Sequence, residues 1–466
     1  MSTKRLESIF VWIALIAGLI MIMIEPPMSC PDERVHFLNA YAVSTGQLVP
    51  HVEDGVLKKT FPQNYVQYID EMTERYAAGN LNEKNNFRDW YYGSWLKEGQ
   101  TEKVGITYWT IDTNPVAYIC AGIAMAIFRM VFQLFSPGLV LPYNLIMVGK
   151  MANLVFYICM CYAALRRVPV LKKTMFLLAL MPMALYQAAS LNYDALLISA
   201  CFYLFAFICQ VVYSYDYEIT FRDILSILGI AIILAGVKQA YVFLLLPLFA
   251  IPQKCFGSRK RFIQCIALVV ITFVVIWGIP RAVIAAYQTN PTDETLAMSE
   301  QFRFIMGNPL SVFTTIGASL YKFRGFYLNG FVGILGQLDT NFPLLFHVLF
   351  WIAIITVIIA DTADIQNITT RFKVLSVIGV ILSIIAVFMG IYLLWTSITQ
   401  GIGADFVDGV QGRYFIPLAP FVMVLLAREN DYLRAPRKRN VVQSITVGTG
   451  AICVISTVLL LFMRYW

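Results

Sequence analysis

Long apolar stretches, separated by short polar or basic segments, recur along the whole sequence. Most have about 17 to 25 residues, the length with which an α-helix crosses the hydrocarbon core of a bilayer. A transmembrane barrel would show short segments of alternating polarity instead. We therefore predict an all-α polytopic membrane protein with about 11 spans. The predicted spans are 9–24, 143–165, 174–190, 195–212, 224–236, 241–251, 262–285, 342–360, 372–395, 414–427 and 441–462.

Composition and charge agree with this class. The chain has 466 residues, of which 59% are hydrophobic and 14% charged, so an ordinary soluble domain is excluded. The net charge of +7 does not indicate nucleic acid, because much of the Lys and Arg lies in short segments beside apolar runs. With a cytoplasmic N-terminus, about half of the 35 Lys and Arg residues fall in inner segments. This topology places the C-terminus outside.

Segment 115–135 is apolar enough to span but carries Arg129 in its interior. If it crossed the membrane, the basic cluster after residue 165 would face outward, against the positive-inside rule. We therefore predict a re-entrant or surface-lying helix here. The single transmembrane domain then has two long extracytoplasmic segments, 25–142 with juxtamembrane helices and 286–341.

The stretch from residue 29 to 46, SCPDERVHFLNAYAVSTG, follows the first span and brings two adjacent carboxylates, Asp32 and Glu33, to a membrane surface. Ser29 and Asp32 fit the S-x-x-D capping pattern, and Gly46 is a typical helix stop. His36 follows Asp32 by four residues, so both can share one helix face. The acidic pair either caps a helix or forms part of an active site, and the spacing does not decide between the two.

Four further ionisable residues lie at the predicted outer ends of spans, where such groups are costly and often functional. Lys150 is expected to snorkel to the interface, with substrate binding as the alternative. Asp194 either caps the following helix or joins the site, and Lys238 is either a loop lysine or a partner for phosphate. Arg413 follows Gly412, which allows close backbone approach, and its planar fork suits phosphate.

Other patterns are weaker signals. Most cysteines lie in apolar segments, no Cys/His metal spacing appears, and no metal or cofactor is predicted. Gly330, Gly333 and Gly336 recur at helical spacing, which favours close helix packing, and His347 is predicted to be a core histidine. Aromatic residues of the first outer segment either stack on sugar rings or, more commonly, anchor the chain at lipid headgroups. These are Trp90, Tyr91, Tyr92, Trp95, Tyr108 and Trp109.

Four stretches together resemble the DUF2142 family of predicted bacterial membrane proteins: CPDERVHFLNAY, LMPMALYQAASLNYDALL, GILGQLDTNFP and VQGRYFIPLAPF. The architecture also resembles the GT-C class of polyprenyl-phosphate-dependent glycosyltransferases. In that class an acidic motif of the first external loop carries the catalytic carboxylate, and the resemblance places it at Asp32 and Glu33. The stretch NPVAY resembles an HPP-type segment without its histidine, so no role is assigned to Asn114. Lys150 stands where relatives often show arginine.

The resemblance and the residues together predict an inverting glycosyltransferase in the bacterial plasma membrane. It would move a sugar from a polyprenyl-phosphate carrier to an extracytoplasmic acceptor such as a cell-surface polysaccharide. Asp32 would act as the general base, and Arg413, Lys238 and Lys150 would stabilise the departing phosphate. The expected partners are the lipid-linked donor, the glycan acceptor and membrane lipid, with no nucleic acid. The alternative is a non-enzymatic flippase or transporter of lipid-linked sugar, although internal repeats typical of transporters are not evident.

Overall fold

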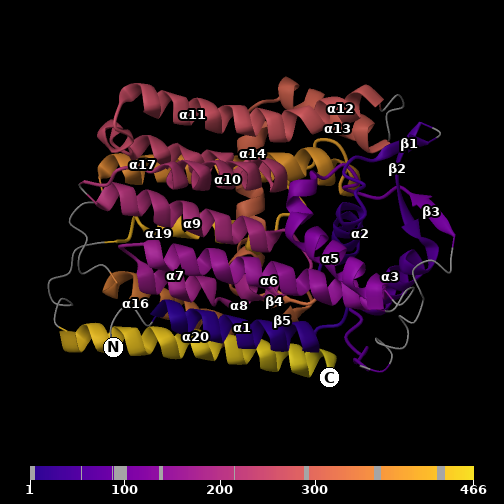
Figure 1. Ribbon diagram of the computed structural model, residues 1–466, viewed down its shortest axis with the longest axis horizontal. Coiled ribbons are helices and arrows are strands. Elements are labelled where there is room, and N and C mark those ends of the chain that lie inside the picture. Colours follow the sequence, from indigo (N-terminus) through magenta and orange to yellow (C-terminus); the bar gives the residue numbers. More distant parts are fainter. Residues whose placement is uncertain are drawn as a thin grey trace.

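The protein is a bundle of long helices that run side by side along the longest axis, with a small β-sheet at one end (Figure 1). The computed structural model describes residues 6–53, 55–86, 88, 102–135, 140–214, 216–287, 293–361, 369–427 and 436–466. The predicted aromatic residues Trp90, Tyr91, Tyr92 and Trp95 lie outside the described residues. The main helices are α1 (Leu6–Ile24), α6 (Pro142–Arg167), α9 (Asp194–Tyr213), α10 (Phe221–Val237), α11 (Arg259–Phe273), α16 (Leu344–Ala360), α17 (Thr370–Ile391) and α20 (Pro436–Tyr465).

Seven stretches of the described chain are long and apolar enough to cross a membrane. All except Pro115–Phe135 coincide with predicted spans, which confirms the polytopic helical membrane class, whereas the count of 11 spans stays a prediction. The seven are Leu6–Ile24, Pro115–Phe135, Pro142–Arg167, Asp194–Tyr213, Arg259–Ala286, Thr370–Thr399 and Asn440–Tyr465. In two of them a π-helical turn interrupts the helix: η5 (Val274–Gly278) leads into α12 (Ile279–Tyr287), and η6 (Tyr392–Thr396) leads into α18 (Ser397–Thr399).

The short predicted span 241–251 is a 3₁₀ helix, η3 (Gln239–Ala250), followed by η4 (Gln253–Phe256). A 3₁₀ helix rises about 2.0 Å per residue against 1.5 Å in an α-helix. Its 12 residues therefore extend about 24 Å rather than about 18 Å, so a short apolar run reaches further than its length implies. Pro247 lies inside η3 and lacks the N–H that an α-helical ladder requires.

Two predicted spans are not single helices. Segment 174–190 divides into α7 (Lys172–Ala179) and α8 (Pro182–Ala188), because Met181 precedes a proline and is extended, with ψ of 140°. Segment 414–427 begins in the 3₁₀ helix η7 (Gly412–Leu418), which contains Pro417, and continues as the short helix α19 (Ala419–Met423). Both segments are largely buried within the bundle.

Basic residues predicted to share one side of the membrane meet at one end of the bundle. Lys172 Nζ lies 2.7 Å from Glu7 Oε1 at the start of α1. Arg167, at the end of α6, lies 2.7 Å from Asp223 in the first turn of α10. This end lies opposite the sheet (Figure 1).

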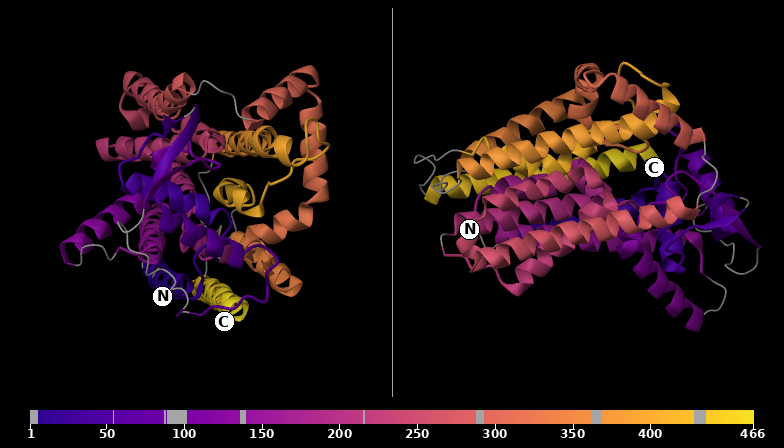
Figure 2. Two further views of the ribbon diagram at one scale, coloured as in Figure 1. Left: turned by 90° about the vertical axis from the view of Figure 1, so that its right-hand side faces the viewer. Right: turned by 90° about the horizontal axis from the view of Figure 1, so that it is seen from above.

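The first predicted outer segment surrounds the opposite end of the bundle. It contains α2 (Glu33–Ser44), α3 (Gln63–Arg75) and an antiparallel sheet in the order β1 (His51–Glu53), β2 (Val56–Pro62), β3 (Lys103–Ile106). Helix α20 lies alongside α1 (Figure 2), and the indole N–H of Trp466 donates to the carbonyl oxygen of Ile24 at this end.

Segment 115–135 forms η2 (Pro115–Tyr118) and α5 (Ile119–Phe135). In α5 the buried residues are Ala121, Gly122 and Met125, whereas Leu134 and Phe135 near its end are 80% and 82% exposed. Length and composition permit a membrane crossing. The prediction that this segment does not span therefore stays untested.

The second predicted outer segment contains α13 (Asp293–Gly307), α14 (Ser311–Lys322), α15 (Arg324–Val332) and a two-stranded ribbon of β4 (Ile334–Leu335) and β5 (Thr340–Asn341). Its three glycines do not share one helix, although Gly330 packs closely against the backbone of Gly412, in line with the predicted close packing. Gly330 lies in α15, Gly333 follows the helix, and Gly336 has φ of +61° in the turn between the strands. His347, in α16, is buried as predicted.

Candidate active site

Asp32 ends the turn that joins α1 to α2. Its φ of +63° lies in the left-handed region, and its side chain is 60% exposed and makes no capping hydrogen bond. Side-chain capping normally needs an extended backbone at this position, and here the left-handed backbone does not provide it. The S-x-x-D capping prediction, which places Ser29 at the N-cap, is wrong because α2 begins only at Glu33, and Ser29 Oγ instead donates to the carbonyl oxygen of Pro26. Gly46 follows the helix with φ of +78°, as expected of a helix stop.

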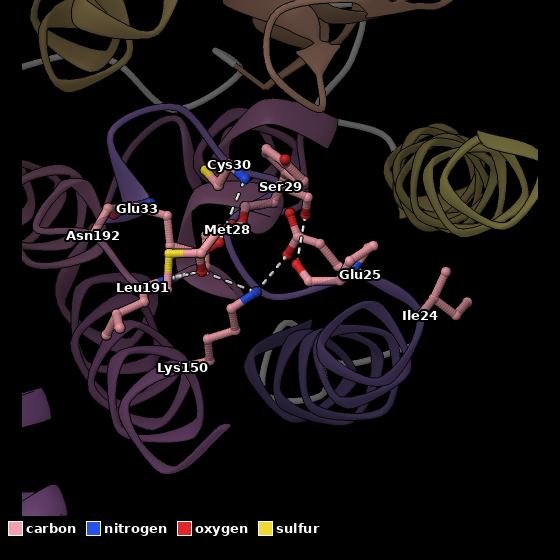
Figure 3. A network of polar contacts seen from close by, with 12 residues as sticks. Ile24, Glu25, Met28, Ser29, Cys30, Glu33, Lys150, Leu191 and Asn192 are labelled. Carbon is pink, nitrogen blue, oxygen red and sulfur yellow. Dashed lines mark hydrogen bonds and ion pairs between the residues drawn. The ribbon is translucent and has the colours of Figure 1, made fainter. Parts of the chain in front are cut away.

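Glu33, the neighbour of Asp32, points in another direction and is fully buried with Lys150 and Glu25 (Figure 3). Lys150 Nζ lies 2.9 Å from Glu33 Oε1 and 3.4 Å from Glu25 Oε2. The Glu33 carboxylate also accepts from the backbone N–H groups of Cys30 at 3.4 Å and Leu191 at 3.3 Å. These contacts join the C-terminal end of α1, the first residue of α2, helix α6 and the loop before α9.

This cluster, Glu25, Glu33 and Lys150, changes two of the sequence-based assignments. Lys150 does not snorkel, because its side chain is 0% exposed and two carboxylates flank its ammonium group. The Glu33 side chain is likewise 0% exposed and is held by Lys150 and backbone donors. The arrangement fits a positioning role for both residues better than direct contact with a substrate.

Arg413, at the start of η7, faces the Asp32 carboxylate with a side chain that is only 4% exposed. Its Nη2 lies 3.6 Å from Asp32 Oδ2, its Nε lies 3.4 Å from Asp194 Oδ2, and its Nη1 donates to Gln187 Oε1 at 3.3 Å. These distances exceed those of strong charge-assisted hydrogen bonds. The guanidinium is therefore oriented by two carboxylates while its donors are only loosely engaged.

The backbone around Arg413 depends on a glycine, as predicted. A Cβ at Gly412 would lie 2.4 Å from backbone atoms of Gly330, Phe331 and Tyr327 in α15. The first turn of η7 can therefore press against α15 only without a side chain at this position. Asp194 is the first residue of α9, and its buried carboxylate faces Arg413 at the end of the bundle that carries α2.

Lys238 supplies a second cation close to Arg413. It directly follows α10, and its Nζ lies 3.3 Å from the ring centroid of Tyr414, the residue after Arg413. Burial lowers the pKa of Lys238 to about 8; the carboxylate of Asp194 raises it, and the charge of Arg413 lowers it further. Among the described residues no carboxylate lies within ion-pair distance of its ammonium group.

His36 lies in the first turn of α2 and is buried, whereas Asp32 precedes the helix with an exposed side chain. Its Nδ1 lies 2.8 Å from the hydroxyl of Tyr118, and the ring of Tyr193 meets it edge-on with centroids 4.9 Å apart. Burial lowers the pKa of His36 to about 4, although the charge of Asp32 acts in the opposite direction. A neutral His36 therefore packs α2 against η2 and the start of α9.

The structure adds residues that spacing did not identify. Gln337, in the turn between β4 and β5, donates 2.9 Å hydrogen bonds to the carbonyl oxygens of Met28 and Cys30 and thereby holds the turn that carries Asp32. Gln187 links Arg413 to Asn192, whose amide donates to the Gln187 side-chain oxygen at 2.8 Å. Both glutamines lie in stretches that carried the family resemblance, but no spacing rule distinguishes them. Within the described ranges there is no group of three or more His, Cys, Asp or Glu side chains that could hold a metal ion.

The fold and the ionisable groups within its bundle define a polytopic helical membrane protein. The chain belongs to the family described as predicted membrane protein (DUF2142), which matches residues 15–422. This match confirms the family resemblance, and the family description states no activity. Comparisons with curated proteins and with solved structures find no match.

Proposed function

We propose that the protein is a GT-C-like glycosyltransferase that uses a polyprenyl-phosphate-linked sugar and acts outside the bacterial plasma membrane. The basic end of the bundle faces the cytoplasm in this proposal, because short basic segments favour that side. The sheet, Asp32 and Arg413 then face outward. No nucleotide cosubstrate is expected there, so a lipid carrier delivers the activated sugar.

The observation that carries the proposal is the pairing of an exposed carboxylate with a buried, loosely engaged guanidinium. Asp32 offers its carboxylate to solvent from a strained backbone position, 3.6 Å from Arg413. Unusual backbone conformations of this kind cluster at functional sites. A base and a phosphate-binding cation are thereby adjacent, as glycosyl transfer from a phosphate carrier requires.

The reaction would proceed as one displacement with inversion. The Asp32 carboxylate takes the proton from an acceptor hydroxyl while the acceptor oxygen bonds to the anomeric carbon. The bond between that carbon and the phosphate oxygen breaks, and its electron pair leaves with the polyprenyl phosphate. Arg413 and Lys238 stabilise the negative charge on the departing phosphate. Asp194 and Gln187 hold the guanidinium in place.

The cluster of Glu25, Glu33 and Lys150 fixes the turn from which Asp32 projects. Because Glu33 follows Asp32 directly, its anchoring by Lys150 and two backbone N–H groups restricts where the Asp32 backbone can lie. Gln337 holds the same turn from another side. Such support is what a catalytic group needs to keep its geometry.

A direct assay tests the proposal. Purified protein in lipid vesicles is given radiolabelled polyprenyl-phosphate sugars together with bacterial cell-wall polysaccharide, and both labelled glycan and the leaflet of the labelled lipid are measured. The proposal predicts labelled glycan that depends on the protein. Movement of the lipid between leaflets without labelled glycan would instead support the flippase alternative, which the buried ionisable cluster also permits.

A further inference from the structure

Two tryptophan rings from distant parts of the chain lie against each other. Trp109 follows β3, and Trp395 belongs to the π-helical turn η6. Their centroids lie 5.8 Å apart with the ring planes at 76°. Trp395 is 42% exposed and Trp109 is partly exposed, so part of their aromatic surface is open.

The pair is connected to two segments that carry residues of the site. A Cβ at Gly409 would lie 2.6 Å from Trp395 Cδ1, so this glycine, four residues before Arg413, packs directly against the ring. On the other side, the amide of Asn39 in α2 donates to the carbonyl oxygen of Thr110, next to Trp109. Asn39 lies in α2, which begins directly after Asp32.

The loop beneath Trp395 is held in place by hydrogen bonds. The backbone N–H of Val407 donates to Ser319 Oγ at 2.7 Å, and that of Asp408 donates to Thr396 Oγ1 at 3.0 Å. The indole of Trp395 is therefore presented by a fixed turn, and less order has to be created when a ligand binds.

Polar groups lie beside the aromatic surface. The Asp408 carboxylate accepts from Thr399 Oγ1 at 3.0 Å and from the Gln400 side-chain amide at 3.2 Å. Thr399 and Gln400 follow Trp395 closely in the chain and are exposed, and Asp408 is partly exposed. Aromatic faces beside exposed hydrogen-bonding groups form a surface for a ligand that is apolar on one face and polar at its rim.

We propose that Trp109 and Trp395 form a subsite for a pyranose ring of the acceptor glycan. A pyranose presents C–H groups on its faces, which match the negative face of an aromatic ring, and hydroxyls at its rim, which match carboxylate and amide groups. Because Trp395 packs against the segment that carries Arg413 and Trp109 is joined through Thr110 to α2, the subsite is assigned to a sugar unit of the acceptor glycan. The identification of the bound sugar as part of the acceptor rests on the proposed function. Pyranose binding itself can be measured without sugar transfer.

The test is saturation-transfer NMR on the purified protein in a detergent without a sugar headgroup. The probes are methyl β-glucoside, methyl β-galactoside and methyl α-mannoside. We expect transfer to the ring protons of at least one probe, reduced about two- to tenfold in Trp395→Leu and in Trp109→Leu. Trp395→Phe, which keeps an aromatic face, should retain more of the signal. Trp12→Leu is the matched control, because Trp12 is 64% exposed on α1.

Absence of saturation transfer from wild-type protein to all three probes would overturn the inference. Equal signals in wild type and both leucine variants would also overturn it and would assign the two rings to membrane anchoring. The same measurement on Asp32→Asn separates this inference from the proposed reaction. Pyranose binding should persist in that variant, whether or not glycosyl transfer is the activity.

Discussion

Replacing Lys150 by methionine removes the ammonium group that lies between the carboxylates of Glu25 and Glu33. Methionine keeps a similar side-chain length and packs well in apolar surroundings, so the substitution removes charge with little loss of volume. The two carboxylates are left fully buried and close together. Their desolvation is then no longer offset by a positive charge.

The expected cost is large. Removing one partner of a buried ion pair typically destabilises a protein by about 3 to 5 kcal/mol, because the remaining charge is uncompensated. The Lys150 side chain is 0% exposed and lies 2.9 Å from Glu33 and 3.4 Å from Glu25, so the upper part of this range applies. Replacing a lysine that merely snorkelled to the interface would change the free energy of unfolding by no more than about 0.5 kcal/mol, as most surface substitutions do.

The assay is equilibrium unfolding in mixed micelles with increasing denaturing detergent, followed by circular dichroism. The matched control is the triple variant Glu25→Gln, Glu33→Gln, Lys150→Met, which has no buried charge in the cluster. Neutral replacement of a whole buried ion pair is often close to neutral in stability, so the triple variant should recover most of the loss. If Lys150→Met alone unfolds within about 0.5 kcal/mol of wild type, the buried ion cluster is not a stabilising element and the reasoning fails.

Three further predictions concern donor binding, pH and topology. Arg413→Lys keeps the charge but loses the planar fork, so donor binding should weaken, and Arg413→Ala should weaken it further. Binding is measured with a radiolabelled polyprenyl phosphate. Unchanged binding in both variants would remove Arg413 from the site. Burial lowers the pKa of His36 from 6.5 to about 4, so as pH falls the unfolded state takes up a proton at a higher pH than the folded state does. His36 should therefore cost the protein up to about 3 kcal/mol of stability between pH 6.5 and 4. The variant His36→Gln should show a shallower decline over this range in thermal unfolding, and an identical pH profile would contradict the assignment. A cysteine at Leu134, placed in a background where the exposed Cys159 is serine, should react with an impermeant thiol reagent from outside the cell; reaction only after permeabilisation would show that segment 115–135 spans.

Much of the fold could be predicted from the sequence because membrane spans are set by apolar length. The spans 9–24, 143–165 and 195–212 differ from the helices of the structure by only a few residues at each end. Segment 174–190 has the same apolar character, yet Pro182 divides it. Hydropathy measures polarity rather than backbone geometry, so neither this break nor the 3₁₀ helix at 239–250 was apparent.

The candidate site could be predicted only in part. The sequence pattern identified Asp32 and Glu33 as candidates but did not predict that Asp32 is exposed and Glu33 buried. Their side chains point in different directions because the backbone at Asp32 is left-handed. The prediction that Lys150 snorkels was wrong because its partner Glu25 is 125 residues away in the chain. The convergence of Arg413 with Asp194 likewise depends on tertiary packing that local patterns do not encode.

Asp32 is the proposed general base, and the rate of sugar transfer by Asp32→Asn tests this role directly. Asparagine tolerates the left-handed backbone about as well as aspartate and has nearly the same shape, so the fold should be unchanged. It cannot accept the acceptor proton, and loss of a general base costs about 100- to 10,000-fold in rate. Asp405→Asn, which changes an exposed carboxylate in the loop before Arg413, is the matched control and should transfer sugar normally. We expect a loss of that size in Asp32→Asn at unchanged thermal stability, whereas near-normal sugar transfer by this variant would show that Asp32 is not the base.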